Sequence, residues 1–169
     1  MKYLVSVILL LTFLPILSNA QTKAESQEKV KTPEELKAEA DATFLDTIEK
    51  GDAPTFYSLL ESGADINAKN GNGTTALMVA ASYERPEFLR VLISRGADIN
   101  AKNNFGNTAL MYAVGQVEMV RDLLLAGANV KAKNESGWTA LKFALKSAHA
   151  REENYQQVIE LLRAYGARK

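Results

Sequence analysis

Apolar residues along the chain gather in short clusters whose spacing predicts helices. Within residues 88–93, 117–125 and 158–162, apolar side chains recur at the i, i+3 and i+4 positions that share one face of a helix. A further helix is predicted to begin at Pro33, because Thr32 offers a hydroxyl cap and Glu35 stands three residues after it. The side chains predicted to form the core of this all-α chain are Phe88, Val91, Leu92, Ile93, Val117, Val120, Leu123, Leu124, Leu125, Val158, Ile159, Leu161 and Leu162.

The predicted helices belong to a repeating unit. The string Gly-Ala-Asp-Ile-Asn-Ala-Lys-Asn occupies residues 63–70 and again residues 96–103, a period of 33, and a degenerate copy occupies residues 127–134. Gly166 and Ala167 keep the start of a fourth copy. A repeat of this length indicates a solenoid, in which stacked units share one core because no single unit can bury its own apolar face.

A second phrase, Thr-Ala-Leu, stands in the same phase at Thr75, Thr108 and Thr139, each time two residues after a glycine. The threonine hydroxyls are expected to cap the first helix of each unit. Alanines on that helix are expected to let neighbouring units pack closely. Each unit therefore reads as a glycine turn, a first helix and a second helix. The glycines expected to close the second helices in a left-handed conformation are Gly63, Gly96, Gly127 and Gly166.

These phrases resemble the ankyrin repeat over most of the chain, from about residue 41 onward. The resemblance implies an all-α ankyrin-repeat solenoid of about four helix–turn–helix units joined by β-hairpin-like loops, with degenerate capping units at both ends. The whole repeat domain is expected to cover residues 33–169. Its units are expected at about residues 37–69, 70–102, 103–133 and 134–169.

The sequence departs from the family pattern in three ways. The usual histidine of the family is replaced by Met78, Met111 and Lys142, so the histidine hydrogen bonds between repeats are expected to be absent. The third unit is two residues short, and we expect the deletion between its helices, around Gly115. The fourth unit is longer by six residues within 147–154, which we expect to form a longer first helix or a projecting turn.

The first twenty residues have a character of their own. Lys2 precedes an apolar run at residues 4–14, and small residues lead up to Ala20, which is the pattern of a secretory signal peptide spanning residues 1–20. Residues 21–32 are polar and are expected to form a flexible leader. The protein is therefore expected to be exported. Asn72 and Asn134 would be glycosylation acceptors in a eukaryotic secretory pathway, where sugars would obstruct the expected binding loops. This conflict and the absence of cysteine favour a bacterial periplasm, with secretion as the alternative.

Composition and charge offer little support for catalysis. The chain carries 20 basic and 20 acidic residues, which gives no electrostatic reason to expect nucleic acid or an anionic membrane as partner. The only imidazole is that of His149, and its helical spacing to Glu152 and Glu153 could hold a metal, although a solvated helix face is the favoured interpretation. We expect no catalytic, cofactor-binding or metal-binding residues, no membrane insertion after signal cleavage, and a monomer.

The resemblance implies that the protein binds another protein through its hairpin tips and the inward face of its first helices. The expected function is a non-catalytic interaction scaffold acting outside the cytoplasm. The alternatives are a secreted effector or toxin-neutralising inhibitor and, less favoured, a metal-binding or enzymatic role at the His149 insertion. The residues expected to contact the partner are Lys69, Gly71, Asn72, Thr74, Ser82, Tyr83, Lys102, Asn104, Phe105, Asn107, Lys133, Glu135, Ser136, Trp138, Lys146 and Ser147.

Two features of this set carry specific expectations. Phe105 stands where the family usually has a polar residue, so it is either an exposed aromatic anchor or a side chain packed on the neighbouring hairpin. Trp138 is expected to brace the last hairpin. Lys69, Lys102 and Lys133 recur in phase and would align as a basic row suited to an acidic partner, although lysine is common at this family position.

Overall fold

The computed structural model describes residues 31–147 and 151–168. The predicted signal peptide (1–20), nearly all of the predicted leader (21–32) and His149 lie outside the described residues. The chain divides into two parts, residues 1–32 and 33–169, and every described helix belongs to the second part. Among the described residues, no helix combines the length and the apolar character that a membrane span requires.

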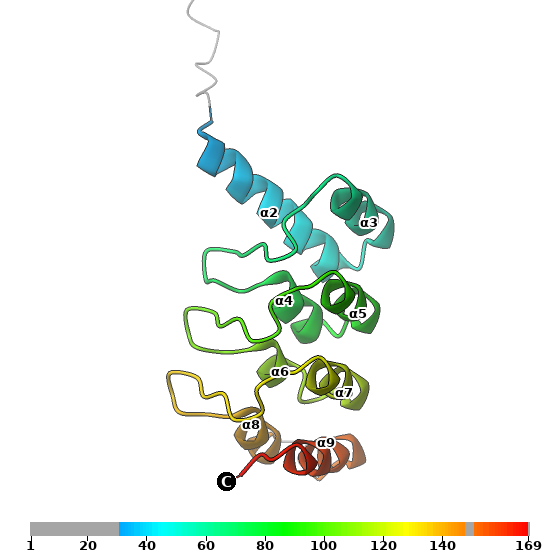
Figure 1. The fold of residues 1–169 in the computed structure, drawn as a ribbon, viewed down its shortest axis with the longest axis vertical. Coiled ribbons are helices and arrows are strands. Elements are labelled where there is room, and N and C mark those ends of the chain that lie inside the picture. The colour runs from blue at the N-terminus through cyan, green and yellow to red at the C-terminus, as the bar shows by residue number, and fades with distance from the viewer. Residues whose placement is uncertain (1–30, 148–150, 169) are drawn as a thin grey trace, which may run out of the picture. The chain divides into compact units, whose positions relative to one another are not determined.

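Eight helices, arranged as four successive pairs, make up the described portion of residues 33–169 (Figure 1). The β pairing found within this portion is a single antiparallel bridge between Lys69 and Thr75, so the predicted all-α class is confirmed. The helices are α2 (Pro33–Lys50), α3 (Ala53–Glu61), α4 (Ala76–Ser82), α5 (Pro86–Ser94), α6 (Ala109–Tyr112), α7 (Val117–Leu125), α8 (Ala140–Lys146) and α9 (Glu153–Ala164).

The pairs stack so that each helix contacts its counterpart in the next pair. Helix α4 packs against both α2 and α6, α6 packs against α8, and the second helices α5, α7 and α9 contact one another in the same order. Three long loops, which precede α4, α6 and α8, all extend to the same side of the stack (Figure 1). We call the segments 69–75, 102–108 and 133–139 the first, second and third hairpin loops.

Small and apolar side chains fill the space between the first helices. Ala80, Ala113 and Ala144 are completely buried, which allows the close helix approach that the sequence predicted. Met78 and Met111 are also buried, so an apolar contact replaces the polar one that a histidine would make. The second helices contribute Phe88, Leu92, Val120, Leu123, Leu124, Val158, Ile159 and Leu162 to the core, as predicted.

The N-terminal pair adds an aromatic cluster that the repeat pattern did not reveal. The rings of Phe44 and Phe56 stack with their centroids 5.4 Å apart, and Phe56 lies 4.4 Å from Phe88 of the next pair. The helix that contributes Phe44 begins at Pro33, as predicted. Aromatic contacts of this kind contribute beyond the area that they bury. They join the first pair to the second.

One predicted core residue is exposed. Leu125 keeps 69% of its surface accessible, whereas Leu123 and Leu124 are buried. Three consecutive residues of a helix span about 200°, so they cannot all face the same core. The prediction for Leu125 was therefore wrong, and its side chain lies on the solvent side of α7.

Local predictions at the ends of helices were confirmed in part. The four glycines that follow the second helices have φ between 84° and 93°, as predicted. Thr75 and Thr139 cap α4 and α8 by accepting hydrogen bonds from the amides of Met78 and Lys142. Thr108 makes no such side-chain bond at the start of α6, so its predicted capping role was wrong.

The two length changes alter different helices. In the third pair, α6 has 4 residues where α4 has 7, so the deletion shortens the first helix. The expected deletion between the helices was wrong, because residues 113–116 still connect α6 to α7. In the fourth pair, α8 has 7 residues, as α4 does, so the first of the two expectations, a longer first helix, was wrong. The other expectation, a projecting turn, falls partly on residues 148–150, outside the described residues. Part of the extra sequence instead lengthens α9, which has 12 residues where α7 has 9.

Candidate partner-binding surface

The three hairpin loops share one backbone design, in which an asparagine organises each tip. The side-chain oxygen of Asn70 accepts hydrogen bonds from the amides of Asn72 and Thr74, at 3.0 and 3.1 Å. Asn103 and Asn134 repeat the arrangement in the second and third loops, with distances of 2.8–3.0 Å. Side-chain caps of this kind fix a turn without the need for a sheet. The tips are therefore held in defined conformations.

Hydrogen bonds also connect each hairpin loop to the next. The amide of Asn104 donates to the carbonyl of Asn72 at 2.9 Å, and the amide of Glu135 donates to the carbonyl of Phe105 at 3.1 Å. The side-chain amide of Asn134 donates to the side-chain oxygen of Asn107 at 2.8 Å. Because these bonds repeat between successive loops, the three tips form one continuous surface.

The second and third loops approach so closely that the turn at the tip of the second loop requires a glycine. Gly106 has φ of 74°, and a Cβ at this position would meet the amide nitrogen of Glu135 at 2.9 Å and the Cα of Asn134 at 3.0 Å. Gly137 has nearly the same backbone conformation, with φ of 71°, but a Cβ there would meet nothing within 4 Å. The steric requirement therefore arises only where another loop follows.

Most of the residues predicted to contact a partner are accessible. Thr74, Asn107, Trp138 and Ser147 are half-buried, and the other members of the predicted set are exposed. The members within residues 69–74, 102–107 and 133–138 lie on the hairpin loops, whereas Ser82, Tyr83, Lys146 and Ser147 lie at the ends of α4 and α8. The structure thus places this set on two neighbouring features, the loop tips and the helix ends.

Phe105 is the most exposed aromatic side chain in the described chain, with 56% of its surface accessible. Its backbone is held on both sides, because its amide donates to Asn103 and its carbonyl accepts from Glu135. The side chain therefore projects from a fixed backbone on the middle loop. Of the two expectations for Phe105, the exposed aromatic is the one observed.

Two residues support this loop that the sequence did not single out. Asn103 is buried, and its side-chain amide donates to the hydroxyl of Tyr112 on α6 at 3.0 Å. The side chain of Asn107 contacts the same hydroxyl at 3.5 Å. Asn103 ends the repeated phrase, so its recurrence was the available signal, but the tyrosine partner occurs in one unit alone and could not be inferred.

Tyr83 has a structural partner as well as an accessible ring. Its hydroxyl donates a hydrogen bond to the carboxylate of Glu49 on α2. This bond holds the hydroxyl proton, and partial burial adds to the effect, so the pKa of Tyr83 is raised above its ordinary value. The bond ties the end of α4 to α2.

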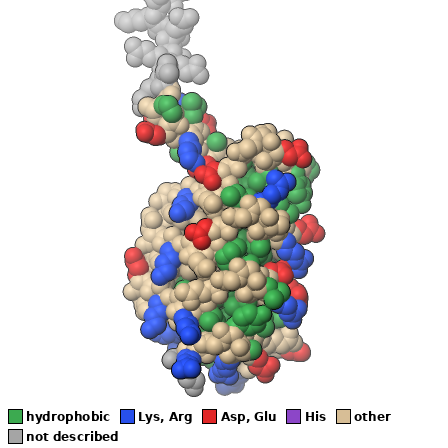
Figure 2. All heavy atoms as spheres, in the orientation of Figure 1, with side chains coloured by type: hydrophobic (Ala, Val, Ile, Leu, Met, Phe, Trp, Pro, Cys, Tyr) green, Lys and Arg blue, Asp and Glu red, His purple; other side chains and the backbone are tan. Residues whose placement is uncertain are grey.

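The three lysines of the predicted row occupy equivalent places in the loops, and all are exposed. The ammonium of Lys102 donates to the carbonyl of Lys133 at 2.8 Å, so this lysine also links two loops. Figure 2 shows blue side chains spaced along the hairpin-loop side of the stack and closest together toward its C-terminal end. The positive charge is therefore concentrated at the C-terminal end of the stack, where basic residues outside this row of lysines add to it.

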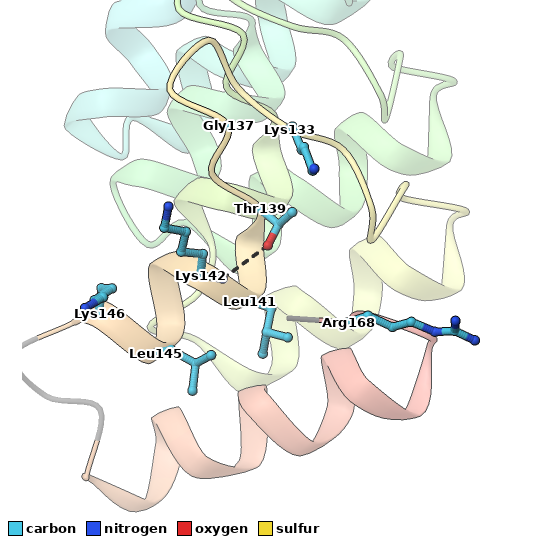
Figure 3. A pocket seen from close by; sticks show the side chains of 8 residues that line it. All are labelled: Lys133, Gly137, Thr139, Leu141, Lys142, Leu145, Lys146 and Arg168. Carbon is cyan, nitrogen blue, oxygen red and sulfur yellow. Dashed lines mark hydrogen bonds between the residues drawn. The ribbon is translucent and has the colours of Figure 1, made fainter.

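This concentration surrounds a groove of about 400 Å³ at the C-terminal end of the stack, which we call the basic groove (Figure 3). Trp138 lies beside it, with its ring 5.1 Å from that of Phe143 and the ammonium of Lys142 4.8 Å from its centre. Trp138 therefore braces the third loop against α8. The lining residues are Lys133, Gly137, Thr139, Leu141, Lys142, Leu145, Lys146 and Arg168.

A family model described as ankyrin repeats (3 copies) matches residues 44–134. The protein is an ankyrin-repeat protein. The match begins within α2, includes α3 to α7 and ends in the third hairpin loop, so the pair α8–α9 extends the ankyrin stack beyond it. A comparison with curated proteins finds no significant match. Ankyrin repeats generally mediate protein–protein interaction, and the family is typically a non-enzymatic scaffold.

The described part of this ankyrin-repeat protein contains no group of three or more metal-ligating side chains. The interpretation of His149 with Glu152 and Glu153 as a metal site involves a residue outside the described part, and it stays a prediction that was not favoured. The accessible features that the structure does describe are a continuous set of loop tips, an exposed aromatic ring and a basic groove.

Proposed function

We propose that this ankyrin-repeat protein is a non-catalytic scaffold that binds a partner protein outside the cytoplasm. The partner contacts the three hairpin tips and the adjoining ends of the first helices. The observation that carries the proposal is Phe105, an exposed aromatic ring on the middle loop whose backbone is fixed by hydrogen bonds on both sides. Rigid aromatic side chains at the centre of a surface provide much of the binding energy in protein interfaces.

The support for export comes from the sequence of residues 1–20, which has the pattern of a secretory signal peptide. Cell fractionation tests this part of the proposal. We expect the protein in the periplasmic fraction. Recovery in the culture medium alone would favour the alternative, a secreted effector or inhibitor, and recovery in the cytoplasm would contradict export.

The binding surface is tested by site-specific photo-crosslinking in living cells. A photoreactive phenylalanine analogue at position 105 should give a discrete crosslinked species that mass spectrometry can identify. Leu125 provides the matched control, because it is similarly exposed but lies on α7, away from the loops. A crosslink at position 125 but not at position 105 would place the interface on the second helices and refute the proposed surface.

A further inference from the structure

The basic groove lies where a further repeat would stack. Lys142 occupies the position that Met78 and Met111 hold in the preceding repeats, three residues after the capping threonine, and those methionines are buried beneath the next pair. Leu145 occupies the position of buried Ala81, yet 37% of its surface is accessible. The groove is therefore the uncovered end of the ankyrin stack among the described residues.

The charged residues that line the groove are all cationic. The cations of the groove come from the third loop, from α8 and from the segment after α9, and no acidic residue contributes to the lining (Figure 3). The ion pairs among the described residues lie elsewhere, as with Arg90 and Asp122 at 2.7 Å or Arg121 and Glu118 at 2.7 Å. Arg90 and Arg121 on the second helices are thus neutralised, whereas no described acidic residue forms an ion pair with the cations of the groove.

Folding accounts for only part of this arrangement. Lys142 and Lys146 are four residues apart on α8, where like charges repel. Lys142 also lies in the first turn of that helix, where the helix dipole disfavours a cation. An end repeat needs a polar outer face for solubility, but neutral or mixed side chains would serve. Lys146 lies in the last turn, where the dipole favours a cation, and Lys142 lies over the Trp138 ring, so the cost that remains is the repulsion between the two lysines, which an anionic ligand would remove.

We propose that the basic groove binds an acidic helical segment of the partner protein, which covers the end of the stack as a further repeat would. Leu145, which keeps 37% of its surface accessible above the buried Leu141, supplies an apolar contact for the segment. The surrounding cations then pair with its carboxylates. The inference rests on the proposed function, because Lys133 and Lys146 belong to both the groove and the proposed binding surface.

A second copy of the chain is the rival occupant. Helix α2, at the other end of the stack, carries six acidic and two basic side chains. Two of those acids are already paired within the helix, Asp41 with Lys37 and Asp46 with Lys50. The charges of α2 are therefore partly satisfied, and a separate acidic segment complements the groove better.

The test uses the protein purified from the cells that produce it, so that any signal peptide has been removed as it is in the cell. The probe is a fluorescently labelled, helix-forming peptide with glutamates around two leucines that are one turn apart, and the comparison peptide carries glutamine at each glutamate. We expect saturable binding of the acidic peptide in anisotropy titrations, weakened by added salt, with the glutamine peptide binding at least about tenfold more weakly. Equal binding of the two peptides would overturn the proposal.

Charge-reversal variants locate the site. Lys142→Glu with Lys146→Glu should weaken the acidic peptide at least about tenfold, while Arg95→Glu with Arg163→Glu, which changes the net charge equally on the second helices, should change it by no more than about twofold. Circular dichroism confirms that each variant is folded. An equal loss in both variants would show attraction to net charge alone and contradict the groove.

Two further outcomes would also decide against the proposal. Sedimentation of the chain alone could show self-association that the groove variant abolishes and the peptide does not compete with, which would assign the groove to a second copy. A crosslink at position 105 without any peptide binding would leave the proposed function standing and refute this inference. Peptide binding without that crosslink would support the groove and count against the proposed surface.

Discussion

Replacing Gly106 with alanine tests how tightly the hairpin loops depend on one another. The residue sits in a left-handed conformation, and its missing side chain is what allows the third loop to approach. Gly137 provides the matched control, because its φ differs by only a few degrees and no loop follows it. Gly137→Ala therefore measures the cost of the backbone conformation, and Gly106→Ala measures that cost plus the cost of the close approach.

The magnitude follows from the contacts. A left-handed alanine costs about 1–2 kcal/mol, partly offset by a less flexible unfolded chain, so Gly137→Ala should lower the free energy of unfolding by about 1 kcal/mol. At position 106, relief of the 2.9 Å contact with the Glu135 amide separates the loops. This weakens the bond from Glu135 to Phe105 and that from Asn134 to Asn107, each worth about 1 kcal/mol. Gly106→Ala should therefore cost about 3 kcal/mol.

Urea denaturation followed by circular dichroism measures both variants against the parent chain. The expected difference between them is about 2 kcal/mol, which corresponds to roughly 6 °C in Tm for a domain of this size. Unchanged m-values would show that the variants unfold as the parent does. Equal losses at the two positions would refute the reasoning, because the loops would then be able to separate at no cost.

Three more predictions concern single side chains. Asn103→Ala leaves two loop amides unpaired and removes the shorter of the two side-chain contacts to the Tyr112 hydroxyl, and thermal unfolding should show a loss of about 2–4 kcal/mol. Thr75→Val should destabilise by about 1 kcal/mol in urea, whereas Thr108→Val should change little because its hydroxyl makes no cap. The Lys37 ammonium holds the pKa of Asp65 below its ordinary value, so this contribution is complete above about pH 4 and is lost as the pH falls through the lowered pKa. Lys37→Met should therefore give urea midpoints that decline less steeply below about pH 4.

Much of the fold could be predicted because the repeat specifies each unit several times over. The glycine that ends a second helix and the small side chains of the first helix recur in phase, so each occurrence supports the others. The prediction for Leu125 was wrong because it depends on the direction in which a side chain points from its helix. Leu125 is apolar and adjacent to core residues, and only its angle around the helix excludes it from the core.

The length changes show a similar limit. The sequence shows how many residues each unit gains or loses, but the packing of neighbouring helices determines which segment absorbs them. The deletion shortened α6, and part of the insertion lengthened α9. Length alone does not distinguish these outcomes from a change confined to the connecting turns.

The candidate surface was predictable in position more than in chemistry. The repeat predicts where the loop tips lie. Phe105 was notable because it stands where the family usually has a polar residue. The basic groove was missed as a unit because its lining comes from residues as distant as Lys133 and Arg168. Lys142 gave the one available signal, as a charged residue at a position that holds a buried methionine in the preceding repeats.

The single tryptophan of the chain has an experimental consequence that comes from its place on the third loop. Trp138 is half-buried against Phe143 and close to the Lys142 ammonium, so its emission depends on the last repeat remaining closed. Far-ultraviolet dichroism averages over all helices. If the two signals change at different denaturant concentrations, the chain unravels from one end. The same fluorophore adjoins the basic groove and can report its occupancy without an added label.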